Sequence, residues 1–169
     1  NYLLRRTITL LEPTILAKPG IYLEKIVITK PVSLISQNKD VIIREEIQET
    51  PLLTISSDNV TLTGFTMQNR GNFSNEGIIL NSAHNCSLIK NTVTNFYTGI
   101  FINSSSNNIL KDNIIDNNYF GIILHESSGN TLRGNNLNRN TFNIVEQNEF
   151  LNDIDSSNII DDKPYMNIK

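Results

Sequence analysis

Residues 77–91 read "GIILNSAHNCSLIKN", and the same pattern returns as "GIFINSSSNNILKDN" at 99–113 and as "GIILHESSGNTLRGN" at 121–135. Each copy opens with Gly-Ile, closes with Leu-x-x-Asn, and starts 22 residues after the copy before it. A fixed period of this size is typical of repeat proteins, in which each unit packs only on its neighbours. The pattern therefore predicts a solenoid.

Superimposing the copies places mostly apolar side chains in four columns. The columns are Ile78, Ile100, Ile122 and Ile144; Leu80, Ile102, Leu124 and Glu146; Leu88, Leu110, Leu132 and Ile154; and Val93, Ile115, Leu137 and Ile159. No helical i, i+3, i+4 stripe persists for 11 residues, and Asn, Ser and Gly between the apolar segments favour turns. Leucine-rich repeats share the period but need a denser Leu spacing. We therefore expect an all-β fold with three short strands per coil of about 22 residues, stacked as a single-stranded parallel β-helix.

Asparagine is the commonest polar residue, with 26 copies. Asn tolerates left-handed backbone and bonds to its own backbone in turns. Asn91, Asn113 and Asn135 share one column, and we expect a structural ladder of amide hydrogen bonds between coils. A second column holds Cys86, Asn108, Asn130 and Asn152. The offset also predicts three surface pairs of opposite charge: Lys90 with Asp112, Arg133 with Asp155, and Arg139 with Asp161.

The repeat frame extends over most of the chain, so we expect a single domain over 1–169. Residues 60–67 align with 86–93 without gaps, and residues 68–76 form an insertion before the first full copy. We expect an N-terminal cap region at 1–19, coils at 20–160 and a C-terminal tail at 161–169. Glu146 enters an inward column, which indicates that the core closes near residue 160.

Composition excludes some classes of protein. A net charge of −3 with mixed signs does not predict a nucleic-acid groove. No run approaches the roughly 18 apolar residues that a membrane helix needs. The chain begins with Asn1 instead of Met, so we expect a removed export signal or a piece of a longer protein, with other domains as possible partners.

The segments "KPGIYLEKIVITKPVSLIS", "DNVTLTGFTM" and "NDIDSSNIIDDKP", together with the three repeats, resemble the right-handed β-helix family called NosD or CASH. The resemblance covers roughly 14–164. It implies a right-handed coil and an extracellular, cell-surface or periplasmic location. Family members include a periplasmic accessory protein of copper enzyme maturation, carbohydrate-binding and carbohydrate-cleaving proteins, and archaeal surface proteins, so the resemblance leaves the function open.

The sequence predicts neither a metal site nor a catalytic centre. Copper requires clustered His, Cys or Met, but His84 and His125 lie in different coils and different columns, and Cys86 falls in an inward column. Sugar hydrolysis requires paired carboxylates, yet no Asp or Glu in 77–164 stacks on another at the 22-residue offset. We therefore expect no cofactor and no enzyme activity.

The remaining hypothesis is a binding face. Rows of amides and hydroxyls suit sugar hydroxyl groups, and aromatic rings cover the apolar side of a sugar. Tyr97 stacks on Tyr119 at the repeat offset, and Phe120 on Phe142. The predicted carbohydrate-binding residues are Tyr97, Tyr119, Arg70, Phe73, His125 and Glu126.

We therefore predict a non-catalytic exported module that binds a polysaccharide or an envelope glycan. The alternatives are a copper-handling accessory protein, a polysaccharide lyase or hydrolase with its active residues in 68–76, and a structural spacer.

Overall fold

The computed structural model describes residues 13–38, 40–44, 51–70, 75–147 and 151–166, and no helix occurs in these ranges. The strands form three sheets, which the chain visits in the order A, B, C on each coil. Sheet A contains β1 (Thr14–Ala17), β4 (Ser33–Ser36), β7 (Thr61–Thr63), β10 (Ser87–Ile89), β13 (Ile109–Lys111), β16 (Thr131–Arg133) and β19 (Asp153–Ile154). Sheet B contains β2 (Gly20–Tyr22), β5 (Val41–Ile43), β8 (Thr66–Gln68), β11 (Thr92–Thr94), β14 (Ile114–Asp116), β17 (Asn136–Asn138), β20 (Ile159–Ile160) and β21 (Lys163–Pro164). Sheet C contains β3 (Ile26–Ile28), β6 (Leu53–Ile55), β9 (Glu76–Asn81), β12 (Thr98–Asn103), β15 (Phe120–His125) and β18 (Phe142–Gln147).

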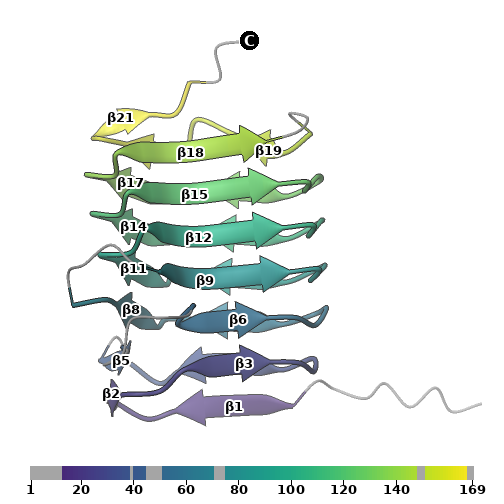
Figure 1. Cartoon of the computed structure of the whole chain (residues 1–169), viewed down its shortest axis with the longest axis vertical. Helices are drawn as coiled ribbons and strands as arrows, with labels where there is room; N and C mark the ends of the chain where they lie inside the picture. Colours follow the sequence, from purple (N-terminus) through teal and green to yellow (C-terminus); the bar gives the residue numbers. More distant parts are fainter. Residues whose placement is uncertain (1–12, 39, 45–50, 71–74, 148–150, 167–169) are drawn as a thin grey trace, which may run out of the picture.

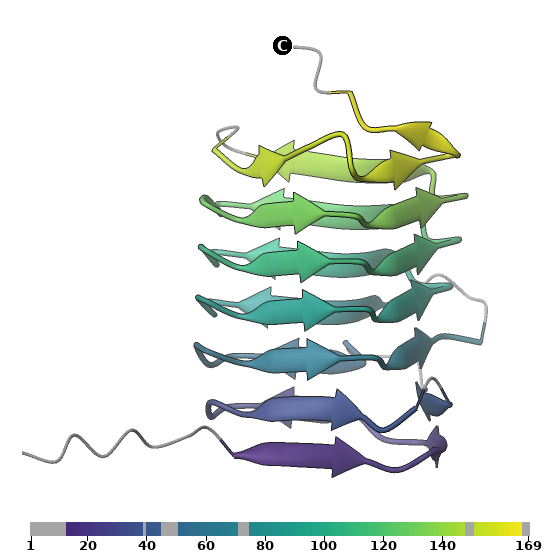
Figure 2. The same ribbon diagram turned by 180° about the vertical axis from the view of Figure 1, so that it is seen from behind.

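The predicted right-handed parallel β-helix is confirmed. In Figure 1 the near strands of sheet C run from left to right while the chain climbs, which is a right-handed path. Figure 2 shows the opposite side, where the strands of sheets A and B follow one another. All pairings are parallel except β20 with β21. Right-handed crossovers are the rule for parallel strands because they fit the twist of the sheet.

The predicted inward columns form the core. In sheet A, Leu110 pairs with Leu88 and Leu132, and all three are fully buried. The residues Ile78, Ile100 and Ile122 of sheet C are buried in the same way. One column is wrong by one residue at its end, because Leu137 pairs with Ile160 and not with Ile159. The turn before β20 holds an extra residue, so Asn135 bonds to Asn158 at an offset of 23.

An asparagine ladder lines every corner of the coil. The predicted Asn91–Asn113–Asn135 ladder is present at the corner between sheets A and B and continues to Asn158. A second ladder joins Cys86, Asn108, Asn130 and Asn152 between sheets C and A. A third, which the sequence analysis missed, joins Phe96, Asn118 and Asn140 between sheets B and C. These amides bond the buried backbone groups that the corners would otherwise leave unpaired.

Both ends of the coil differ from the expected boundaries. Strand β1 lies inside the region 1–19 that we expected to form a cap, and it pairs with β4, so the described coils already include residues from Thr14. Residues 1–12 lie outside the described part of the chain. At the other end, the expected tail 161–169 contains β21, which folds back antiparallel on β20 because Asp161 and Asp162 adopt left-handed turn conformations. This hairpin covers the edge of sheet B.

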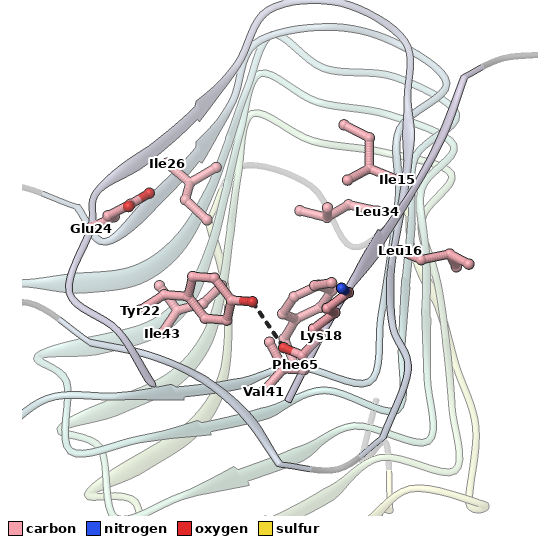
Figure 3. Close-up of a pocket in the computed structure, with 11 residues that line it drawn as sticks. Ile15, Leu16, Lys18, Tyr22, Glu24, Ile26, Leu34, Val41, Ile43 and Phe65 are labelled. Atoms are coloured by element: carbon pink, nitrogen blue, oxygen red, sulfur yellow. Dashed lines mark hydrogen bonds between the residues drawn. The ribbon is translucent and has the colours of Figure 1, made fainter. Parts of the chain in front are cut away.

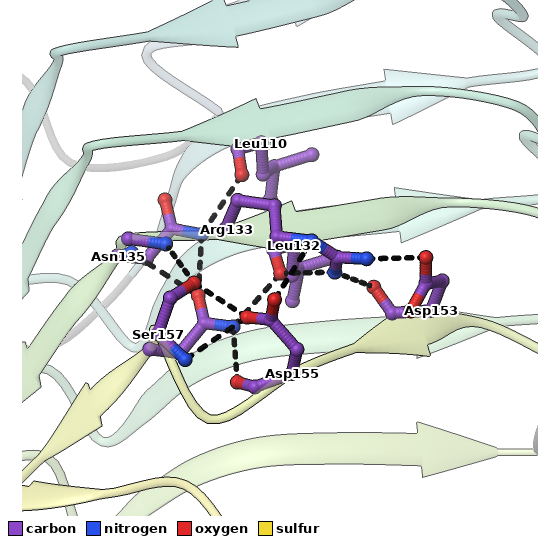
Figure 4. A network of polar contacts seen from close by, with 9 residues as sticks. Leu110, Leu132, Arg133, Asn135, Asp153, Asp155 and Ser157 are labelled. Carbon is purple, nitrogen blue, oxygen red and sulfur yellow. Dashed lines mark hydrogen bonds and ion pairs between the residues drawn. The ribbon is translucent and has the colours of Figure 1, made fainter.

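One of the three predicted charge pairs is present as expected. Arg133 contacts Asp155 with 3.0 Å between Nε and Oδ2, and also pairs with Asp153 (Figure 4). Arg139 pairs with Asp116 of its own corner instead of Asp161, which accepts its backbone N–H. Lys90 and Asp112 form no ion pair with each other. The ion pairs of Arg133 and Arg139 are partly or largely exposed, so they favour the register more than they add stability.

Candidate functional site

The outer side of sheet C is the widest flat surface of the described coil. Its strands β9, β12, β15 and β18 are six residues long, whereas the strands of sheets A and B in the same coils are two or three residues long. Side chains alternate along a strand, so those between the buried Ile100 and Ile102 point outward. We call this surface the sheet C face; it is the near side in Figure 1.

Aromatic rings line the edge of this face where the strands begin. Tyr97 and Tyr119 stack with ring centroids 5.1 Å apart and an interplanar angle of 10°, as predicted. Phe120 and Phe142 stack at 5.1 Å and 21°. Tyr119 meets the edge of Phe120 at 4.9 Å, which joins the two stacks into one cluster. The exposed fractions are 44% for Tyr97 and 38% for Tyr119, so the cluster is open to solvent.

The stacking limits what the two tyrosines can offer. Each ring covers one face of the other, so the two tyrosines do not present two free ring faces each to a ligand. Both tyrosines keep part of their surface exposed, and no hydrogen bond joins either phenol to a described residue. The pair therefore offers hydroxyl groups at one-coil spacing more readily than it offers two ring faces.

An apolar column crosses the middle of the face. Phe101 pairs with Ile79 on one side and Ile123 on the other, and Ile123 pairs with Val145. All four side chains are partly exposed. These residues were not among the predicted site residues, although their position between two inward residues of an alternating strand is visible in the repeat. Phe101 is the one aromatic ring of this column.

A polar column runs along the other edge, where the strands end. The Asn103 amide donates to Oδ1 of Asn81 at 3.0 Å, and its own Oδ1 lies 3.0 Å from Nδ1 of His125. Because the amide oxygen can only accept, His125 donates from Nδ1, and in the neutral ring Nε2 is then an acceptor. One corner position further on, Ser104 donates to Glu126 at 3.4 Å. This column presents amide, imidazole and carboxylate groups one coil apart.

The predicted site residues do not form a single cluster. Tyr97 and Tyr119 lie at the start of the sheet C strands, and Arg70 is exposed at the same corner one coil earlier. His125 and Glu126 lie at the far end of β15. About 16 Å of strand separates the two groups, at 3.3 Å per residue. Phe73 lies outside the described residues, so its place on this surface stays a prediction.

Other hollows lie away from the sheet C face. A cavity of about 410 Å³ opens at the N-terminal end of the core, where Tyr22 donates to the Lys18 carbonyl and Phe65 forms part of the wall (Figure 3). It lies at the N-terminal end of the apolar core that the described residues form. A groove of about 380 Å³ follows the corner between sheets A and B, lined by Thr66, Thr92 and Lys90 among others.

The described residues show no clustered set of the side chains that bind copper. No group of three or more His, Cys, Asp or Glu side chains lies close enough together there to hold a metal ion. Cys86 and Met67 are completely buried in the core. Nδ1 of His84 accepts the backbone N–H of Ser106 at 3.0 Å, and His125 is held by Asn103. The soft ligands that copper prefers are therefore separated from one another.

The fold and this open face define a right-handed parallel β-helix protein. The family model described as "Periplasmic copper-binding protein (NosD)" matches residues 12–167. The chain therefore belongs to the NosD family. No curated protein matches the chain. No helix in the described ranges is long and apolar enough to span a membrane.

Two solved structures share the fold. ORF18 of Geobacillus virus E2 aligns with a TM-score of 0.66 and 12% identity over 86% of this chain and 32% of that chain. The Dettilon tailspike protein (gp208) aligns with a TM-score of 0.62 and 11% identity over 76% of this chain and 26% of that chain. This chain thus spans a third or less of either relative. At such low identity the similarity concerns the fold alone.

Proposed function

We propose that the chain is a non-catalytic, exported module that binds a glycan along the sheet C face. The observation that carries the proposal is the parallel arrangement of three kinds of side chain over several coils. The aromatic cluster at Tyr97 and Tyr119, the apolar column at Phe101 and the amide column at Asn103 run side by side. Sugars carry apolar C–H faces and hydroxyl edges, which match apolar and polar columns respectively.

The repeat favours an extended ligand over a small one. Successive coils place equivalent groups about 4.8 Å apart along the solenoid axis. A polymer that lies along this axis meets a similar surface at each coil, and many weak contacts then add up. The description of the NosD family as periplasmic supports export.

A panel of immobilised polysaccharides tests the proposal. Bound protein and newly formed chain ends are measured in the same samples, for the natural chain, for Phe101→Ala and for Ile109→Ala. Ile109 is a matched control, because it is 44% exposed on sheet A. We expect binding without new ends, weakened by Phe101→Ala only. New chain ends would show that the module is an enzyme. An equal loss of polysaccharide binding in both variants would contradict binding on the sheet C face.

Copper handling is a second candidate, favoured by the description of the family model. The described residues offer no clustered ligand set, so this function requires a partner protein or residues outside the described ranges. Titration of the chain with Cu(I) and Cu(II) tests it. Tight stoichiometric binding that His84→Ala or His125→Ala abolishes would favour copper over a glycan.

A further inference from the structure

The charges on the sheet C face select among glycans. Strands β9, β12, β15 and β18 contain no Lys or Arg, and their only carboxylates are Glu76 and Glu146. Glu146 belongs to an inward column and accepts a hydrogen bond from Asn152 at 2.9 Å. The face therefore carries no fixed positive charge within its strands.

The basic side chains of the same coils lie elsewhere. Lys111 and Arg133 project from sheet A, and Arg133 is paired with Asp153 and Asp155. Arg139 is paired with Asp116. Among the described residues, the corner beside the aromatic edge exposes Arg139, whose partner is Asp116, and Arg70, which follows β8 before the first long strand of sheet C. A chain of uronate or sulfate groups would thus meet at most one unpaired cation among the described residues.

An anion placed on the apolar column would lose hydration without a compensating partner. Burying an unpaired carboxylate is far more costly than burying a hydroxyl group that makes hydrogen bonds. Phe101 and Ile123 can cover the C–H face of an uncharged sugar without that cost.

The polar column has the same preference. In the neutral imidazole of His125, Nδ1 donates to Asn103 and the Nε2 lone pair is available to accept a hydrogen bond. A sugar hydroxyl can donate to this atom, whereas a carboxylate cannot. Glu126 next to it adds a negative charge that repels anions. Both edges of the face are therefore suited to hydroxyl groups.

We infer that the ligand of the sheet C face is an uncharged polysaccharide that lies along the solenoid axis. This inference rests on the proposed function and narrows it to one class of glycan. Its hydroxyl groups bond to the Asn103–His125 column, and its C–H faces pack on Phe101 and Ile123.

The test measures affinities of the full chain for two probes, a neutral glucan oligosaccharide and an oligogalacturonate of equal length. The variants are Phe101→Ala, Ile123→Lys and the sheet A control Ile109→Lys, each checked for folding by circular dichroism and thermal melting. We expect the neutral probe to bind about tenfold more tightly or better, and Phe101→Ala to weaken it by about tenfold. Ile123→Lys should shift the preference toward the acidic probe, while Ile109→Lys should not.

Each other outcome has a separate meaning. Tighter binding of oligogalacturonate, weakened by Phe101→Ala, would overturn the uncharged ligand and leave the glycan-binding face intact. Equal binding of both probes would also overturn it. No binding of either probe, repeated with neutral and acidic polymers of other compositions, would overturn the proposed function itself. If the affinity for the neutral probe is unchanged by Phe101→Ala, the binding site lies away from this face.

Discussion

Asn113 accepts the backbone N–H of Asn91, one coil away, with 2.9 Å between N and Oδ1. The same oxygen accepts a second bond from the Asn91 amide, and the Asn113 amide donates to the Leu88 carbonyl and to Asn135. Asn113 is completely buried, so it uses all of its hydrogen-bonding capacity inside the protein. The repeated asparagines thus hold the coils together at the corner between sheets A and B.

Replacing this residue should destabilise the whole solenoid. Asn113→Ala leaves the Asn91 N–H and the Leu88 carbonyl buried without their amide partner. We expect a loss of about 2–4 kcal/mol in the free energy of unfolding, measured by urea denaturation. Asn103→Ala on the surface is the control, with an expected change within about 0.5 kcal/mol. Equal losses for the two variants would contradict a special role for the buried ladder.

The glycine at the second position of β9, β12 and β15 is required for lack of space. A Cβ atom on Gly99 would lie 2.8 Å from the Gly121 carbonyl oxygen and 3.0 Å from the Asn118 amide nitrogen. Both atoms are fixed by the stacking of coils, so neither can easily move. We expect Gly99→Ala to cost about 1–3 kcal/mol and to lower the melting temperature. An unchanged melting temperature would show that the corner can adjust.

Tyr165 directly follows β21 of the C-terminal hairpin and packs against the core near Glu146. Burial raises the pKa of Tyr165 above its ordinary value of 10.0, and the charge of Glu146 raises this pKa further. Because the folded chain holds this proton more tightly than the unfolded chain, stability should fall as pH rises above about 10. The difference in tyrosinate absorbance between the natural chain and Tyr165→Phe reports this titration. Glu146→Gln should lower the Tyr165 pKa; a titration unaffected by Glu146→Gln would contradict the contribution of that carboxylate.

The stacked tyrosines allow a distinction between ring and hydroxyl contacts. Tyr97→Phe keeps the 5.1 Å stack with Tyr119 but removes one phenol group. If the exposed edges and hydroxyl groups contact the glycan, this variant should lose about 1 kcal/mol of binding free energy without losing stability. Calorimetric titration with the neutral oligosaccharide measures this change in binding free energy. Full affinity in Tyr97→Phe together with loss in Tyr97→Ala would mean that a ring face binds instead.

The coil could be predicted because the same packing requirements recur in every repeat. Parallel stacking places residue i beside residue i+22, so a buried position such as Leu110 must be apolar in every coil. The same rule predicted the Asn113 ladder and the Tyr97–Tyr119 stack. It was wrong where the offset changes, as at Ile159, since one extra turn residue shifts every later partner.

The candidate site was harder to predict. The sequence shows which residues share a column, but it does not show how far apart two columns lie across a strand. Tyr97 and His125 were therefore grouped, although they lie at opposite edges of sheet C. Phe101 was overlooked, because one aromatic residue in an otherwise aliphatic column looks like core. Its exposure depends on strand alternation and on the open side of sheet C.

Backbone amide chemical-shift mapping by NMR can show whether a glycan lies on the sheet C face. The chain is titrated with the neutral oligosaccharide, and the shifted amides are located on the coil. We expect the shifted amides to lie in β12 and β15 and at the corner with Tyr97 and Tyr119, and the amide shifts of sheets A and B to stay unchanged. Shifts confined to the groove between sheets A and B around Lys90 and Thr92 would contradict binding on the sheet C face.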